Sequence, residues 1–191
     1  MKLELIRKEK LKRIVKEIQY FESISSTHLL AKEKDFADGT LLIAEEQTGG
    51  IGTKDRKWFT KRGENIAITI ALKPDMKVSS LAGLTYELAD SMKQVLKEKY
   101  DIFVEIKMPN DLMLNGKKLS GILIESSSLG EEVKHLWISI GMNVNQIDFE
   151  EEIKDIATSL KKEFGKEFLR EEILSYWFEE IEKLIVQRES K

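Results

Sequence analysis

Residues 107–125 read Lys-Met-Pro-Asn-Asp-Leu-Met-Leu-Asn-Gly-Lys-Lys-Leu-Ser-Gly-Ile-Leu-Ile-Glu and predict one tight β-hairpin. Asn115-Gly116 is the preferred dipeptide of a two-residue type I′ turn, because both residues tolerate a positive φ. The turn folds 111–114 back against 118–125, so Lys118 begins a strand whose apolar neighbours belong to the core. A lysine held on such a strand neutralises a carboxylate or phosphate better than a mobile surface lysine does.

Length and composition favour one globular domain over residues 1–191. The chain has 191 residues, of which 41% are hydrophobic and 34% charged, and its net charge of −3 gives no general attraction to DNA or to an anionic membrane. The lack of cysteine excludes disulfides and thiolate metal sites, and two histidines far apart argue against a metal site built from a protein cluster. No apolar run is long enough to span a bilayer and the N-terminus is too charged for a secretory signal, so a cytoplasmic location is expected.

Apolar periodicity predicts an α+β fold, in which a mixed, mostly antiparallel β-sheet is covered by helices on one face. Ser25 or Ser26 is expected to cap a short helix that ends near Lys34. Helical spacing also predicts helices over 78–96 and 170–187. The segment 47–63 has no periodicity and is expected to be a long loop. The expected strands are 19–24, 41–45, 66–72, 103–107, 111–114, 118–126 and 133–143.

Residues 1–18 carry apolar side chains at near-helical spacing among many lysines and arginines. This pattern predicts an N-terminal amphipathic helix packed on the domain. A basic arm that contacts nucleic acid is the alternative.

Four stretches resemble the motifs of one enzyme family, in the same order. The hairpin at 107–125 is similar to the Lys-Trp-Pro-Asn-Asp and Lys-x-x-Gly-Ile-Leu-x-Glu motif of biotin protein ligases. Residues 25–28 resemble their Asp-Ser-Thr-Asn, residues 46–58 their Gln-x-x-Gly-Arg-Gly-Arg-x-Gly-Arg-x-Trp loop, and residues 139–145 their Gly-Ile-Gly-x-Asn-Val-Asn. The resemblance covers about residues 20–185 and is to the catalytic domain, whose fold is shared with lipoate-protein ligases.

This resemblance implies the biotin ligase catalytic fold, which is similar to that of class II aminoacyl-tRNA synthetases. Larger family members carry an N-terminal helix-turn-helix domain that represses transcription, and most continue into a small SH3-like C-terminal domain. Residues 1–18 are too short for the first, and the chain stops at Lys191 without the second, so we expect neither domain and no DNA partner. A homodimer is the expected assembly, because relatives often pair through sheet edges.

The implied reaction has two steps and needs biotin, ATP and Mg²⁺. Biotin is first activated to biotinyl-5′-adenylate with release of pyrophosphate, and the adenylate then passes biotin to one lysine of a biotin carboxyl carrier protein, as in acetyl-CoA carboxylase. Such an enzyme needs cations and amides that hold two anions together, and a dry site that protects the adenylate from water.

The resemblance also assigns residues. Lys118 is the expected catalytic residue, bridging the biotin carboxylate and the α-phosphate, and a solvated strand-end lysine is the alternative. The biotin site is expected to comprise Ser26, Thr27, Gln47, Gly50, Gly52, Lys118, Gly121 and Gly141. The ATP site is expected to comprise Arg56, Trp58, Lys107, Asn110, Asp111 and Asn143, with Mg²⁺ arriving on the nucleotide near Asn143. A helix cap at 26–27 and a purely structural Pro-Asn turn at 109–111 are the competing explanations.

The chain departs from the family pattern mainly in the loop. Ile51 and Thr53 stand where relatives have arginines, and Asp55 replaces a glycine and places a negative charge near the phosphates. His28 replaces the usual Asn, and Met108 the usual Trp. These changes leave two alternatives open: a non-catalytic relative that binds biotin or a carrier, and a lipoate or octanoate ligase or transferase.

Overall fold

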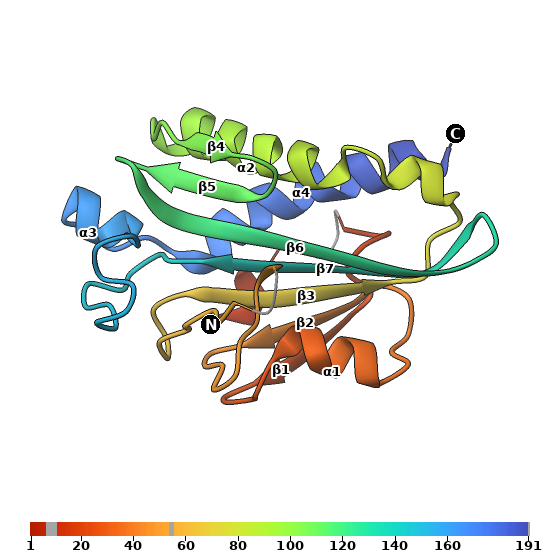
Figure 1. Ribbon diagram of the computed structural model, residues 1–191, viewed down its shortest axis with the longest axis horizontal. Coiled ribbons are helices and arrows are strands. Elements are labelled where there is room, and N and C mark those ends of the chain that lie inside the picture. The colour runs from red at the N-terminus through yellow and green to blue at the C-terminus, as the bar shows by residue number, and fades with distance from the viewer. Residues whose placement is uncertain (7–10, 54–55, 191) are drawn as a thin grey trace.

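The structure is a computed structural model that describes residues 1–6, 11–53 and 56–190. Within these residues seven strands form one sheet in the order β1-β2-β3-β7-β6-β5-β4 (Figure 1). Only β1 and β2 pair in parallel, and every other pair is antiparallel. The strands are β1 (Glu17–Phe21), β2 (Thr40–Ala44), β3 (Ile66–Leu72), β4 (Glu105–Lys107), β5 (Asp111–Leu114), β6 (Lys117–Leu129) and β7 (Glu132–Met142).

Four α-helices and two 3₁₀ turns accompany the sheet in the described part of the chain. The α-helices are α1 (Thr27–Glu33), α2 (Leu84–Tyr100), α3 (Leu160–Phe164) and α4 (Arg170–Glu189), and the 3₁₀ turns are η1 (Leu3–Leu5) and η4 (Val78–Leu81). None of the described helices is long and apolar enough to cross a membrane.

The main core lies between the sheet and the two long helices, α2 and α4 (Figure 1). Strand β3 sends Ile66, Ile68 and Ile70 into this core, as the period of two along a strand requires. Helix α4 contributes Trp177 and Phe178, both fully buried. The expected mixed sheet under helices is therefore confirmed.

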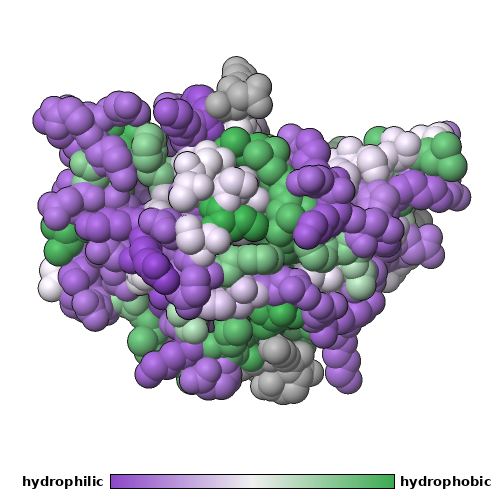
Figure 2. Space-filling view, turned by 90° about the horizontal axis from the view of Figure 1, so that it is seen from below, coloured by the Kyte–Doolittle hydropathy of each residue, from purple (hydrophilic) through white to green (hydrophobic). Residues whose placement is uncertain are grey.

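The opposite face of the sheet is only partly covered. Helix α1 contacts β2, β3 and β7 there, and Ala31 packs with Leu42 and Ala71 in a second, smaller cluster. Figure 2 shows the side of the molecule on which β1 and α1 lie, with hydrophilic residues around a paler and more hydrophobic centre. The prediction placed all helices on one face, but α1 lies on the face opposite α2 and α4. The site forms on the part of that face that α1 leaves uncovered.

The predicted helix over residues 1–18 is wrong for its described part, and 7–10 lie outside the described residues. Leu11 and Ile14 are fully buried, but the segment turns and then enters β1 at Glu17. The backbone N–H groups of Arg13 and Ile14 donate to the carboxylate of Glu182 in α4, at 2.7 and 2.9 Å. Tertiary partners therefore take the hydrogen bonds that a helix would have used.

Other boundaries moved by a few residues. The helix predicted from residue 78 begins only at Leu84, because Gly83 has a φ of 77° and separates α2 from the 3₁₀ turn η4. Strand β1 lies two residues earlier than predicted, and α3 was not predicted. The prediction for β3 is confirmed to the residue.

Candidate active site

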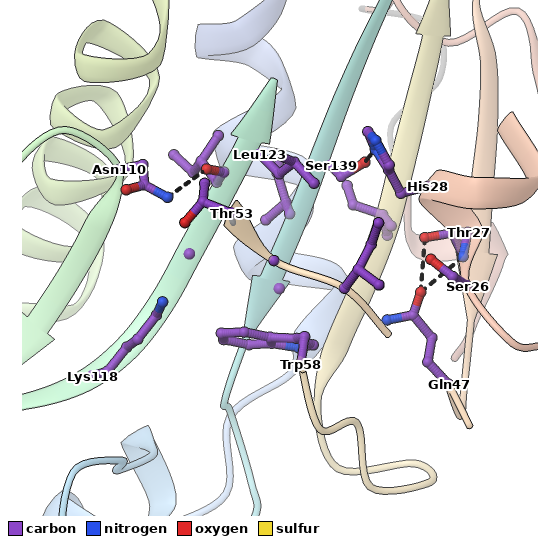
Figure 3. Close-up of a pocket in the computed structure, with 17 residues that line it drawn as sticks. Ser26, Thr27, His28, Gln47, Thr53, Trp58, Asn110, Lys118, Leu123 and Ser139 are labelled. Atoms are coloured by element: carbon purple, nitrogen blue, oxygen red, sulfur yellow. Dashed lines mark hydrogen bonds between the residues drawn. The ribbon is translucent and has the colours of Figure 1, made fainter. Parts of the chain in front are cut away.

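A cavity of about 40 Å³ lies where α1, the β2–β3 loop and strands β3, β6 and β7 meet (Figure 3). A second cavity of about 390 Å³ shares Gly52, Trp58 and Lys118 with the first, and Arg56 and Asn143 also line it. Of the predicted site residues, the first cavity brings together Ser26, Thr27, Gln47, Gly52, Trp58, Asn110, Lys118, Gly121 and Gly141.

Lys118 lies at the start of β6, directly after the predicted turn. Asn115 and Gly116 have φ values of 49° and 75°, so the type I′ geometry expected from the sequence is confirmed. The Lys118 ammonium lies 2.7 Å from Asp111 Oδ1 on the neighbouring strand β5. The lysine side chain is 29% exposed and the aspartate 12%. The pair is thus a partly buried cation with one fixed counter-charge at the junction of the two cavities.

Gly121 makes room for this ion pair. A Cβ at Gly121 would lie 3.2 Å from Lys118 Nζ and 3.5 Å from Asp111 Oδ1. Glycine at this position therefore keeps the ammonium against the strand, in addition to the predicted effect of leaving backbone open to a ligand.

Trp58 closes the first cavity. Its indole lies on Gly141 of β7, where a Cβ would meet Trp58 Cε2 at 2.2 Å, so only glycine fits under the ring. Trp58 Nε1 is buried without a hydrogen-bond partner among the described residues. Lys118 Nζ lies 5.5 Å from the ring centroid, which is cation–π distance. The small volume of the first cavity follows from this placement of the indole.

The far end of the first cavity is polar. Ser26 caps α1 by accepting from the backbone N–H of Leu29 at 3.4 Å, as predicted. Gln47 Oε1 accepts from Thr27 twice, from the backbone N–H at 2.8 Å and from the hydroxyl at 3.0 Å (Figure 3). The Gln47 amide N–H₂ donates to Thr60 at 3.4 Å. This end offers neutral donors and acceptors and carries no charge of its own.

His28 follows Thr27 on α1 and is 2% exposed. Its Nδ1 lies 2.7 Å from the hydroxyl of Ser139 on β7, and its Nε2 lies 3.4 Å from Glu125 Oε2 on β6. Glu125 is in turn paired with Lys32. Burial lowers the pKa of His28 below its ordinary value, although the Glu125 carboxylate acts in the opposite direction.

The two asparagines predicted for ATP hold backbone segments together. Asn110 donates to the carbonyl of Ile122 at 2.9 Å, and Asn143 donates to the carbonyl of Thr158 at 3.1 Å. Both are buried, at 7% and 4% exposed. Each still lines a cavity, so a structural and a binding role are compatible.

Three residues predicted for the site have positions or contacts other than the predicted ones. A Cβ at Gly50 would meet the Trp58 carbonyl oxygen at 2.4 Å, so this glycine shapes the loop. Arg56 lines the second cavity, but its guanidinium also donates to Thr53 at 2.9 and 3.2 Å. Lys107 is exposed on β4 and lines neither cavity, so its contact with ATP stays a prediction. Lys54 and Asp55 lie outside the described residues.

Sequence reasoning missed several residues of the site. Ser139 lines the polar end of the first cavity, and Thr69 supports it from behind by contacts with Thr27 and Ser139. Thr69 is the one hydroxyl residue in the otherwise apolar strand β3, a signal that was available. Glu152, Ile153 and Ile156 line the second cavity from a segment without periodicity. Ile156 is placed by its carbonyl, which accepts from the Lys118 backbone N–H at 2.7 Å.

Residues 20–144 match the model of the biotin/lipoate A/B protein ligase family. The chain belongs to this family. The hairpin of Lys118, the loop of Trp58 and the strand of Gly141, which line the first cavity, all lie within the matched residues.

Similar proteins support the assignment. The chain is 36% identical over 162 residues to the bifunctional ligase/repressor BirA of Bacillus subtilis, which covers 82% of this chain. It is 30% identical over 172 residues to the biotin–[acetyl-CoA-carboxylase] ligase of Mycobacterium tuberculosis, which covers 85% of this chain and 61% of that protein. The biotin protein ligase of Aquifex aeolicus, solved with biotin and ATP, superimposes with a TM-score of 0.79 at 33% identity, covering 92% of this chain and 73% of that one.

The match to the bifunctional ligase/repressor of Bacillus subtilis covers 50% of that protein, so this chain spans about half of its length. The likeness therefore concerns the part that the chain shares, which is the part that carries both cavities.

Proposed function

We propose that this chain is the catalytic domain of a biotin protein ligase. It would activate biotin with ATP to biotinyl-5′-adenylate and pass the biotinyl group to a lysine of a biotin carboxyl carrier protein, with acetyl-CoA carboxylase as the expected carrier enzyme. The cytoplasm is the proposed location, and Mg²⁺ would enter bound to the nucleotide.

The observation that carries the proposal is the position of Lys118. Its ammonium lies where the two cavities meet, paired with Asp111 and beside Trp58. A biotin carboxylate from one side and an α-phosphate from the other repel each other, and a fixed cation between them lowers the energy of the state in which they react.

Each cavity suits one substrate in this scheme. The neutral polar end around Ser26, Thr27 and Gln47 suits the ureido ring of biotin, whose valerate chain would run over Gly52, Gly121 and Gly141 toward Lys118. The second cavity, with Arg56, Trp58, Asn143 and the apolar side chains of Ile153 and Ile156, suits adenine and phosphates. Asn110 and Lys107 complete the proposed ATP site.

The proposed first step moves no proton through the protein. The biotin carboxylate oxygen attacks the α-phosphorus, and the bond to the departing pyrophosphate breaks. Lys118 neutralises the charge that gathers between the carboxylate and the α-phosphate, while Asp111 holds the ammonium in place. In the proposed second step the neutral amine of the carrier lysine attacks the acyl carbon, the bond to AMP breaks, and the amine proton passes to solvent, with Asp111 as the carboxylate that would orient the amine.

Binding of biotin would require Trp58 to move. A cavity of about 40 Å³ is far smaller than ligand pockets, which reach several hundred Å³. The indole occupies the surface of Gly141 along which the ligand would run. Once displaced toward the second cavity, it would be available to stack on adenine.

The direct test is incubation with biotin, ATP, Mg²⁺ and a purified carrier domain, followed by mass spectrometry of the carrier. We expect Lys118→Ala to lower the rate of pyrophosphate release by about 100- to 1,000-fold. Lys117→Ala is the matched control, because Lys117 precedes Lys118 on β6 and lines neither cavity.

Full activity in Lys118→Ala would refute the assigned role. Biotin binding by calorimetry without pyrophosphate release in the wild type would identify a non-catalytic binding protein. Transfer of a lipoyl or octanoyl group in preference to biotin would identify the other branch of the family.

A further inference from the structure

A row of buried hydroxyl groups joins His28 to Gln47 through Thr69, and Figure 3 shows its two ends, His28 with Ser139 and Thr27 with Gln47. His28 Nδ1 lies 2.7 Å from Ser139 Oγ, and Ser139 Oγ lies 2.8 Å from Thr69 Oγ1. Thr69 lies 2.9 Å from the Thr27 hydroxyl, which lies 3.0 Å from Gln47 Oε1. With the 3.4 Å contact between His28 Nε2 and Glu125, the row contains five contacts and ends in an acceptor on each side.

Both ends of the row accept and do not donate. Gln47 Oε1 also accepts from the backbone N–H of Thr27 at 2.8 Å, and this N–H fixes which atom of the amide faces Thr27. At the other end, an ionised Glu125 has only acceptor oxygens. Every proton in the row must therefore come from the residues between them.

The proton count does not close with a neutral histidine. Ser139, Thr69 and Thr27 supply one hydroxyl proton each, and a neutral imidazole supplies one more. Four protons serve five contacts, so one contact is left with two facing lone pairs. Only an imidazolium, with protons on both ring nitrogens, would fill all five.

The surroundings of His28 disfavour that imidazolium. The charged groups facing it are Glu125 on β6, which favours the cation, and Lys32 on α1, which disfavours it. Burial weighs most, and it lowers the pKa of His28. Independently of its pKa, His28 Nε2 is buried and makes no hydrogen bond within the described residues, with Glu125 Oε2 at 3.4 Å as its nearest charged neighbour.

We propose that His28 is a positioning residue that leaves this row one proton short, and that an N–H group of the ligand supplies the missing proton. The inference rests on the proposed biotin site and deepens it. It selects a neutral cyclic urea, which has N–H donors, over a dithiolane, which has none. An unfilled buried contact favours the ligand that completes it, because unpaired buried polar groups are costly.

Acid should therefore weaken binding. When His28 takes up a proton, each of the five contacts has its own hydrogen-bond donor. The ligand N–H then has no unfilled contact to complete. Since ligand binding and protonation of one group then compete, the Kd should rise by up to about tenfold for each pH unit below the pKa of His28.

The test combines NMR with calorimetry. The chain has two histidines, so ¹⁵N imidazole spectra are simple, and His135→Asn assigns the remaining signal to His28. We expect His28 to be neutral near pH 7 and its pKa to fall further when ligand binds. Calorimetry of biotin and of 2-imidazolidinone between about pH 5 and 8 should show the Kd rising toward acid, over the range in which a histidine titrates.

Two variants remove the effect by different routes. His28→Asn replaces the titrating group with an amide, and Ser139→Ala cuts the row, so both should give a Kd that is flat with pH. His135→Asn is the control and should keep the wild-type slope, because His135 contacts Ser127 and Asp35 outside the cavity.

A flat Kd in the wild type, or tighter binding in acid, would overturn the proposal. So would loss of the slope in His135→Asn, or no binding of either ligand at any pH. Because 2-imidazolidinone has no carboxylate to activate, pH-dependent binding of it in a protein without ligase activity would refute only the proposed function.

Discussion

The hairpin of β5 and β6 and the loop between β2 and β3 both reach the site, but they are held in different ways. Strand β6 pairs with β5 over residues 117–121 and with β7 from Ser120 onward, and the backbone N–H of Lys118 also donates to the Ile156 carbonyl at 2.7 Å. In the described part of the loop, 46–53 and 56–65, strand-like pairing is limited to isolated bridges, Ile24 with Gln47, Gln47 with Thr60 and Ile51 with Lys57. The rigid hairpin thus supplies the cation Lys118, and the more adaptable loop supplies Trp58, which covers the cavity.

The base of the loop is fixed by a buried ion pair. Arg170 of α4 donates to Glu45, where the loop begins, and to the carbonyl of Asn65, where it ends, both at 2.9 Å. The Trp58 indole, by contrast, rests on Gly141 with its N–H unpaired in the part of the chain described, and Trp58 is held by its backbone N–H, which donates to the Gly50 carbonyl at 2.8 Å. A firm base and a loosely held tip are what a segment that opens for a ligand requires.

The largest effect is expected from a substitution that breaks the ion pair at the base of the loop. Glu45→Gln leaves the buried Arg170 without its counter-charge and should lower the free energy of unfolding by about 3 kcal/mol. Guanidinium unfolding followed by circular dichroism measures this loss. Glu46→Gln is the control, as the adjacent and less buried carboxylate, and should stay within about 0.5 kcal/mol of wild type.

The same ion pair sets an acid limit. Burial opposes ionisation of Glu45, but hydrogen bonds from Arg170 outweigh it and lower the pKa to about 2. A folded-state pKa below the unfolded value stabilises the protein above the unfolded pKa, and this stability is lost as pH falls from about 4.5 toward 2. Glu45→Gln should therefore lose less stability than wild type over that window, and an equal loss would argue against the ion pair.

A smaller effect is expected from crowding the hairpin. In Gly121→Ala the new Cβ presses on the Lys118 ammonium and should lower kcat for pyrophosphate release by about 10- to 100-fold, because small displacements of a catalytic group are costly. Gly49→Ala in the loop is the comparison, since its Cβ would make only ordinary contacts, the nearest at 3.5 Å. An equal loss of kcat in both variants would show that the hairpin tolerates an added Cβ as well as the loop does.

The smallest effects are expected from substitution of Trp58 at the tip of the loop. Trp58→Ala should tighten biotin binding, because no indole needs displacing, and should raise the KM for ATP about tenfold through lost stacking. Calorimetry and steady-state kinetics measure the two changes. Trp137→Phe, on the same strand face as Gly141 but stacked on His135, should change neither. A Trp58→Ala variant that weakens biotin binding would contradict the closing role.

Much of the site was predictable where local geometry decides. The turn at Asn115-Gly116, the cap at Ser26 and strand β3 follow from positive φ, from a free helix N–H group and from alternation, and each is confirmed. The segment 1–18 was not predictable in this way. Its apolar spacing fits a helix, but its N–H groups bond to Glu182, which lies 168 and 169 residues away.

By itself the sequence determined the hairpin that carries Lys118, the family motifs and the positions of most strands along the chain, because these depend on neighbouring residues. Only the tertiary structure decided that Trp58 covers Gly141 and that His28 meets Ser139 across 111 residues. It also decided that the Lys118–Asp111 pair occupies the space beside Gly121. Contacts between distant residues depend on how the sheet brings strands together, and no local pattern in the sequence encodes which hydroxyl, ring or carboxylate will lie opposite.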